Sequence, residues 1–159
     1  MPDPILTSAR DALRRSRDDT RAAIDGLPPD ALNWRPAGDD TNSIAAMANH
    51  AVTSARTWLS VAVDAPLPDR DRPTEFQFEA ASAAALLAFT DGLFEDCLSL
   101  IDSSRTVDWA ALRKHWDPGR EIELFPAWAL LHALEHLREH LGQILLTRQL
   151  WETQAAGLD

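Results

Sequence analysis

The sequence predicts an all-α protein and, within that class, a four-helix bundle. Four stretches of about 22 to 29 residues carry apolar side chains at helical spacing. Segments rich in proline, aspartate or glycine separate them, and no alternation of apolar and polar residues lasts long enough to indicate a sheet. Such helices must bury their apolar faces against one another, and 159 residues suffice for one core. We therefore expect a single bundle domain over residues 1–159.

The first predicted helix spans residues 4–25. A thin apolar stripe runs along it, and Gly26 followed by the two prolines at 28–29 provides a stop signal. The joint 27–40 contains further prolines, but its centre includes Trp34, which is not typical of a flexible linker. We expect this tryptophan to fold onto the end of the bundle.

The second predicted helix spans residues 42–63, where apolar residues recur on one face. Asn42 or Ser43 can cap its first turn by accepting a hydrogen bond from a free backbone N–H. The connection 64–74 that follows is rich in proline and in charge, so a solvated and extended chain is expected there. This connection is long enough to run back along a bundle.

The third predicted helix spans residues 75–103, and the fourth spans residues 126–151. Between them, residues 104–124 are expected to form an irregular joint, which has room for a short helix over 108–114. The tail 152–159 is expected to fray.

Composition and charge narrow the function classes. The formal net charge is −10, whereas nucleic acids and anionic lipids are bound by basic surfaces, so neither is expected as the main partner. No apolar run is long enough to span a bilayer, and the first residues show no secretory signal. Cys97 is the single cysteine, which excludes an intrachain disulfide and fits a cytoplasmic location.

The fourth predicted helix contains three of the five histidines of the chain, at a spacing of four. Residues four apart lie one turn apart on the same side of a helix, so two such imidazoles can hold one metal ion. His132 and His140 are separated by a rise of about 12 Å and cannot share an ion. The pair is therefore His132 with His136, or His136 with His140. His140 falls within the apolar arc of this helix and His136 at its edge, so burial favours the second pair.

A third ligand has to come from another element. His50 is the only histidine in another long predicted helix, and it lies near the apolar side of that helix. Three neutral imidazoles with one open position suit Zn²⁺, Ni²⁺ or a similar divalent ion. Two simpler interpretations remain open at this point: His50 as a hydrogen-bonded core histidine, and His136 with His140 as a pair on the surface.

Several further residues fit one family pattern. Its marks are Leu32-Asn33-Trp34-Arg35-Pro36, Asn42-Ser43-Ile44, His50 followed by Trp58-Leu59, and His136-x-x-x-His140-x-Gly142-Gln143. In this order and spacing the chain resembles the DinB-like superfamily of metal-binding four-helix bundles, which includes mycothiol- and bacillithiol-dependent transferases. The resemblance covers nearly the whole chain.

The resemblance implies an up-down-down-up bundle, homodimers, and a metal ion held by His50, His136 and His140. The chain departs from the frequent family pattern at Glu139, where another histidine is common, and at Leu141, where arginine is common. Neither position is a ligand position, so the expected metal site is unaffected.

The resemblance favours a metal-dependent thiol S-transferase, in which the ion presents a low-molecular-weight thiolate, such as that of mycothiol or bacillithiol, to an electrophile. The alternative is a non-catalytic, stress-related or small-molecule-binding bundle with a regulatory or vestigial metal site. Ring N–H groups that face away from the ion need acceptors, and Gln143, Glu135 and Glu139 are candidates. Cys97 is better explained as a small core residue than as a nucleophile. His132 is expected to lie beside the ligands or in solvent.

The six tryptophans are expected in the core or at the bundle ends: Trp34, Trp58, Trp109, Trp116, Trp128 and Trp151. Trp58 lies two turns beyond His50 and can form a wall of the pocket, whereas Trp128 and Trp151 can instead join a subunit contact.

Overall fold

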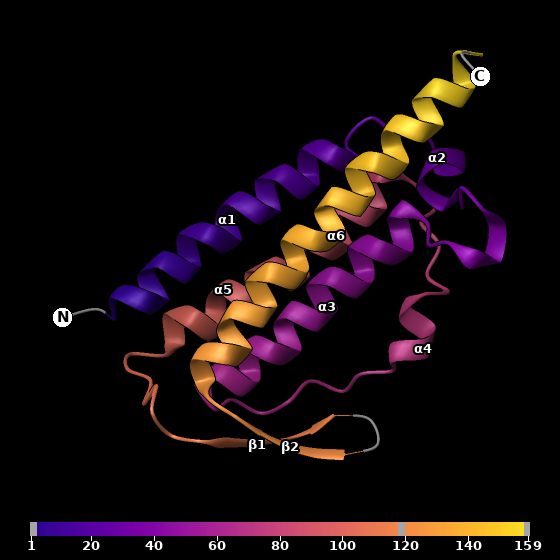
Figure 1. Cartoon of the computed structure of the whole chain (residues 1–159). Coiled ribbons are helices and arrows are strands. Elements are labelled where there is room, and N and C mark those ends of the chain that lie inside the picture. Colours follow the sequence, from indigo (N-terminus) through magenta and orange to yellow (C-terminus); the bar gives the residue numbers. More distant parts are fainter. Residues whose placement is uncertain (1–2, 118–119, 158–159) are drawn as a thin grey trace.

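In the computed structural model, which describes residues 3–117 and 120–157, most of the chain is helical. Four long helices lie side by side: α1 (Pro4–Ile24), α3 (Ile44–Val63), α5 (Ala83–Ser103) and α6 (Pro126–Ala155) (Figure 1). Helices α1 and α6 run toward one end of the molecule, and α3 and α5 run toward the other. Helix α3 packs against α5 and α6, and α1 packs against the same two helices. None of the helices in the described part of the chain combines the length and the apolar character needed to cross a bilayer.

Short polar side chains begin three of these helices. Asp3, Ser43 and Ser82 accept hydrogen bonds from backbone N–H groups in the first turns of α1, α3 and α5. Of the two predicted caps of α3, Ser43 is therefore the one used. Gly26 follows the end of α1 with a φ of 75°, a left-handed conformation that glycine adopts without steric cost.

The joint between α1 and α3 contains the short helix α2 (Pro29–Asn33) and the 3₁₀ turn η1 (Gly38–Asp40). The ring of Trp34 meets the ring of Trp151 edge to face, with 5.6 Å between their centroids. This contact lies near the C-terminal end of α6, so the expected position of Trp34 at the end of the helices is confirmed.

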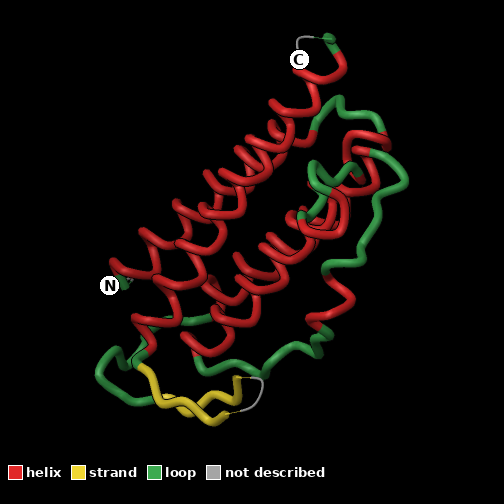
Figure 2. Tube along the Cα trace, turned by 45° about the vertical axis from the view of Figure 1, so that its right-hand side comes forward, coloured by secondary structure: helices red, strands yellow, loops and turns green. Residues whose placement is uncertain are grey.

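Residues 64–82, here called the strap, connect α3 to α5. They run along the outside of α3 back toward the end where α3 begins, and they include the short helix α4 (Arg72–Glu75) (Figures 1 and 2). The predicted start of the third helix at residue 75 was wrong, because α5 begins only at Ala83. The Asn33 amide explains the difference, since it bonds to both the carbonyl and the N–H of Ala80, at 2.9 and 2.8 Å, and holds the strap in a non-helical path.

The joint before α6 contains a β-hairpin, which the sequence analysis did not predict. Strand β1 (Arg113–Asp117) pairs antiparallel with β2 (Arg120–Leu124), and Figure 2 shows the hairpin at one end of the helices. In β2, Ile122 is partly buried and Leu124 buried, while Glu121 and Glu123 are exposed. This alternation covers only four residues, which is why it was too short to indicate a sheet. The predicted short helix over 108–114 is absent, and Pro118 and Gly119 of this joint lie outside the described residues.

The last helix is longer than predicted. It continues past Trp151 to Ala155, so the first half of the tail that was expected to fray is helical, whereas residues 158–159 lie outside the described part of the chain. Arg148 supports this extension, because its Nε donates to Glu152 at 2.8 Å one turn further on.

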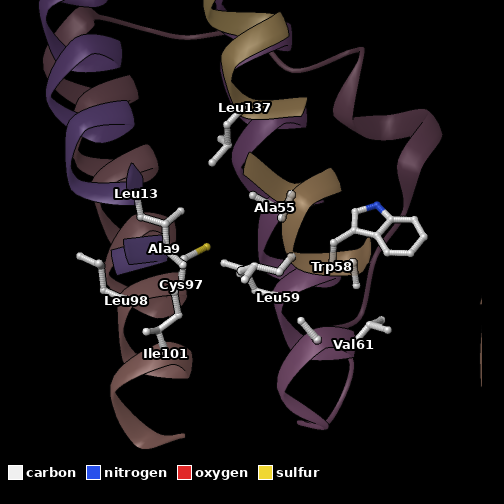
Figure 3. Close-up of a cluster of buried hydrophobic side chains, with 14 of the residues drawn as sticks. Ala9, Leu13, Ala55, Trp58, Leu59, Val61, Cys97, Leu98, Ile101 and Leu137 are labelled. Atoms are coloured by element: carbon white, nitrogen blue, oxygen red, sulfur yellow. The ribbon is translucent and has the colours of Figure 1, made fainter. Parts of the chain in front are cut away.

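Buried apolar side chains fill the space between the long helices, and Figure 3 shows one cluster of them. Phe94 of α5 is the largest fully buried side chain in the described chain, with 1% of its surface exposed. Cys97 lies in the same buried cluster as Leu13 and Leu59 and has no exposed surface (Figure 3). Burial raises the pKa of its thiol to about 12, so the side chain stays protonated. Cys97 is therefore a small core residue, as expected.

Replacing Phe94 with alanine is predicted to lower the free energy of unfolding by about 3–5 kcal/mol, because it removes a buried ring and leaves a cavity. Replacing Leu112, which is 58% exposed, with alanine should change it by no more than about 0.5 kcal/mol. Urea denaturation followed by circular dichroism measures both changes. Equal effects of the two substitutions would contradict the assignment of Phe94 to the core.

Cys97 is predicted to resist thiol reagents in the folded protein at pH 8, because it is both buried and protonated. A chromogenic disulfide reagent should react with one thiol per chain only after denaturant is added. Rapid labelling of the native protein would show that this side chain is accessible.

Candidate metal centre

The structure brings together three imidazoles from two helices. His50 comes from α3, and His136 and His140 come from adjacent turns of α6. One ring nitrogen from each residue lies within 4.8 Å of the corresponding nitrogen of the other two. His50 is 3% exposed, whereas the other two rings are partly exposed, so the group lies at the edge of the core. The three histidines predicted to act together are therefore neighbours.

The packing of α3 places His50 in this group. Helix α3 lies against both α5 and α6, and most of its residues are buried. Many of these are alanines, such as Ala46 and Ala51, whose small side chains let helices approach closely. On α6, the spacing of four puts His136 and His140 on one side of the helix, next to α3.

In two of the three rings, the nitrogen that points away from the other histidines forms a hydrogen bond with an acceptor. The Nδ1 of His50 lies 2.7 Å from Oε2 of Glu75, and the Nδ1 of His140 lies 2.8 Å from Oε1 of Gln143. Because a carboxylate and an amide oxygen only accept, the proton of each neutral ring is on Nδ1. In both residues the lone pair of Nε2 is consequently available to a metal ion.

The distance between His136 and His140 tests whether one metal ion fits between their rings. The Nε2 atoms of His136 and His140 are 3.2 Å apart. Two nitrogens bound at about 2.0–2.1 Å to one tetrahedral ion would be about 3.3 Å apart, so the two rings could bind one ion with almost no change in their separation. The buried Nδ1 of His136 has no hydrogen-bond partner within the described residues. With an ion bound, the proton of this ring would sit on Nδ1, and its Nε2 would present a lone pair beside that of His140.

The electrostatic environment keeps His136 and His140 neutral. Burial lowers the pKa of His136 to about 3, and positive charge on the neighbouring histidines and on Arg70 acts in the same direction. Burial also lowers the pKa of His140, although the hydrogen bond to Gln143 partly opposes the shift. A neutral imidazole is the form that binds a metal ion, so His136 and His140 are in the binding form at neutral pH.

The sequence analysis did not identify Glu75 as the hydrogen-bond acceptor beside His50. Glu75 is 5% exposed and belongs to α4 of the strap, far from His50 in the chain. Of the three acceptors proposed, Gln143 is confirmed, whereas Glu135 and Glu139 make no hydrogen bond to a histidine within the described residues. The one relevant signal was the long connection after α3, which was expected to run back along the helices and so to pass His50.

A cavity of about 720 Å³ opens beside two of the three histidines. Its lining residues come from α3, the strap, β1 and α6: His50, Ser54, Thr57, Trp58, Leu67, Pro68, Arg70, Asp71, Arg72, Pro73, His115, His132 and His136. Trp58 therefore borders the pocket, as expected. A cavity of this size lies in the range that holds small organic ligands.

His132 belongs to the wall of this cavity and not to the group of three. Its ring stacks on Trp128 and meets Trp58 edge to face, in both cases with 4.9 Å between centroids. The ring is partly exposed, and its centroid lies 5.6 Å from that of His136. The structure thus favours His136 with His140 over His132 with His136 as the pair on α6.

Comparison with known proteins agrees with this architecture. Residues 12–144 match the family model of the DinB superfamily. The crystal structure of a conserved protein from Enterococcus faecalis superposes with a TM-score of 0.71 at 17% identity, over 94% of this chain and 97% of that chain, which shows a shared fold. No curated protein gives a significant match. The family model covers most of the sequence, and the chain therefore belongs to the DinB superfamily.

Proposed function

We propose that His50, His136 and His140 hold a divalent metal ion, Zn²⁺ or Ni²⁺, and that the protein is a metal-dependent thiol S-transferase. The observation that carries this proposal is the convergence of three imidazoles at the edge of a cavity of about 720 Å³. Three histidines leave one position of a tetrahedral ion open to a ligand from the cavity.

If bound by His50, His136 and His140, a divalent ion would lower the pKa of a thiol and so make a thiolate nucleophile available at neutral pH. The residues of the chain would orient the histidine ligands and shield the cavity from solvent. Glu75 and Gln143 fix the ring orientations of His50 and His140, and the strap covers one side of the cavity. The thiol would be a low-molecular-weight compound such as mycothiol or bacillithiol, and the remaining cavity volume would receive the electrophile.

We also propose a helix arrangement, a domain organisation and an oligomeric state for the chain. The directions of the four long helices support an up-down-down-up bundle, and residues 1–159 are taken as one domain acting in the cytoplasm. A homodimer is proposed through the outer face of α6, whose exposed large apolar side chains include Trp128 at 49%, Leu131 at 65% and Leu146 at 57%. Trp128 is exposed, whereas Trp151 is only partly exposed, so Trp128 is the better candidate for the subunit contact.

The metal proposal predicts that the purified protein, stripped by a chelator, binds about one zinc or nickel ion per chain. His50→Ala and His140→Ala should each weaken binding by more than the roughly 10–100-fold that loss of an outer partner costs. His132→Ala should retain the affinity of the wild type, because its ring lies in the cavity wall. Competition with a chromogenic chelator measures these constants.

Unchanged zinc binding in His140→Ala would contradict the proposal and would favour a purely structural role for the histidines. An equal loss of zinc affinity in His132→Ala would instead favour His132 with His136 as the pair of ligands on α6.

The transferase proposal predicts that the zinc- or nickel-loaded protein accelerates the consumption of mycothiol or bacillithiol by an electrophile such as monochlorobimane. The metal-free protein and the His140→Ala variant serve as controls and should show only the uncatalysed rate. Fluorescence of the thioether product measures the reaction. Metal binding without consumption of any tested thiol would favour the alternative, a small-molecule-binding bundle with a regulatory or vestigial metal site.

A further inference from the structure

The strap contributes a buried carboxylate to the metal centre. Oε2 of Glu75 lies 2.7 Å from Nδ1 of His50, and only 5% of the glutamate surface is exposed. A carboxylate in this position fixes the tautomer of the ligand, orients its ring and raises the electron density on the nitrogen that faces the ion. Glu75 therefore acts on the centre through His50 and does not need to touch the ion.

A second partner keeps the Glu75 carboxylate charged. Nε of Arg70 donates to Oε1 at 2.6 Å, and Nη2 donates to Oε2 at 3.0 Å, which forms a two-pronged pair. Burial by itself raises the pKa of Glu75, but the hydrogen bonds with His50 and Arg70 outweigh it, so the pKa lies below its ordinary value. A buried carboxylate without such partners would be costly.

Further contacts fasten the same part of the strap to α3. The amide of Asn49 donates to the backbone carbonyl of Glu75 at 3.3 Å, and the ring of Phe76 lies 4.4 Å from that of His50, centroid to centroid. The guanidinium of Arg35 donates to the carbonyl of Phe76 at 2.6 Å. The turn that carries Glu75 is thus held against the helix that carries His50.

This part of the strap also forms a wall of the cavity. Residues 67–68 and 70–73 line it, while His132 and His136 line it from α6. Arg70 belongs to both structures, because it lines the cavity and pairs with Glu75. Any movement of the strap away from α3 would open the cavity and would also withdraw Glu75 from His50.

We infer that Glu75 is a positioning residue of the metal centre, and that through it the binding of the ion and the closure of the strap over the cavity stabilise each other. The inference rests on the proposed metal site. The coupling is reciprocal, because an ion that binds more tightly when the strap is closed must favour the closed strap to the same extent. The strap then sets both the affinity for the ion and the access of small molecules to it.

The test compares Glu75→Gln with a matched control, Glu79→Gln, in the full chain. In Glu75→Gln the new amide oxygen would still accept a hydrogen bond from His50, but the charge that pairs with Arg70 would be lost. Glu79 lies in the same strap, is exposed, and makes no side-chain hydrogen bond or ion pair within the described residues. Glu75→Asp is the conservative variant, since it keeps the charge but is too short to span both partners.

Three readouts separate positioning from mere structural support. Zinc affinity by chelator competition should fall about 10–100-fold in Glu75→Gln, less in Glu75→Asp, and not in Glu79→Gln. The visible absorption spectrum of the cobalt-loaded protein should change in Glu75→Gln and should stay as in the wild type in Glu79→Gln. Hydrogen exchange of residues 65–82 should slow when zinc is added to the wild type, and this slowing should be lost in Glu75→Gln.

The outcomes are distinct. Wild-type zinc affinity and an unchanged cobalt spectrum in folded Glu75→Gln would overturn the positioning role while leaving the metal site intact. Unchanged exchange of the strap on zinc addition to the wild type would overturn the coupling. Failure of the wild type to bind zinc at all would remove the metal proposal itself. Circular dichroism of the metal-free protein shows whether Glu75→Gln folds. If it does not, the same three measurements on Glu75→Asp test the positioning role and the coupling.

Discussion

The packing of α3 against α6 determines where the chemistry of this protein can take place. His50 belongs to one helix and His136 with His140 to the other, and no single helix could place three imidazoles around one point. Close approach of the helices is possible because α3 carries several buried alanines, which leave room for the imidazoles to meet. The ligand group is thus a product of core packing, and its precision comes from the rigidity of a buried helix.

The strap adds what the helices lack. Histidine ligands need acceptors for their outer N–H groups, and the face of α3 around His50 offers none of its own in the described structure. Glu75 fills this role from a segment without regular structure over most of its length, and Arg70 keeps its charge in place. The motif Leu32–Pro36 gains a physical meaning here, because Asn33 and Arg35 hold the backbone of the strap at Ala80 and Phe76.

The sequence predicted the features that depend on local pattern. Apolar periodicity located the four long helices, the spacing of four identified the histidines of α6, and the place of His50 near an apolar face made it the third candidate. Features that depend on contacts between distant segments were missed. The non-helical path before Ala83 is set by Asn33, the hairpin by pairing between two strands of five residues each, and the contact of Glu75 with His50 by the course of the strap. None of these leaves a periodic pattern long enough to be recognised in the sequence.

X-ray absorption spectroscopy at the zinc edge tests the central claim most directly, because it reports the atoms around the ion without reference to activity. The account predicts three imidazole nitrogens at about 2.0–2.1 Å in the wild type and fewer in His50→Ala, with a sulfur neighbour at about 2.3 Å once the thiol is added. A first shell made mainly of carboxylate oxygens, or a spectrum that His50→Ala leaves unchanged, would show that the ion binds elsewhere and would contradict the account.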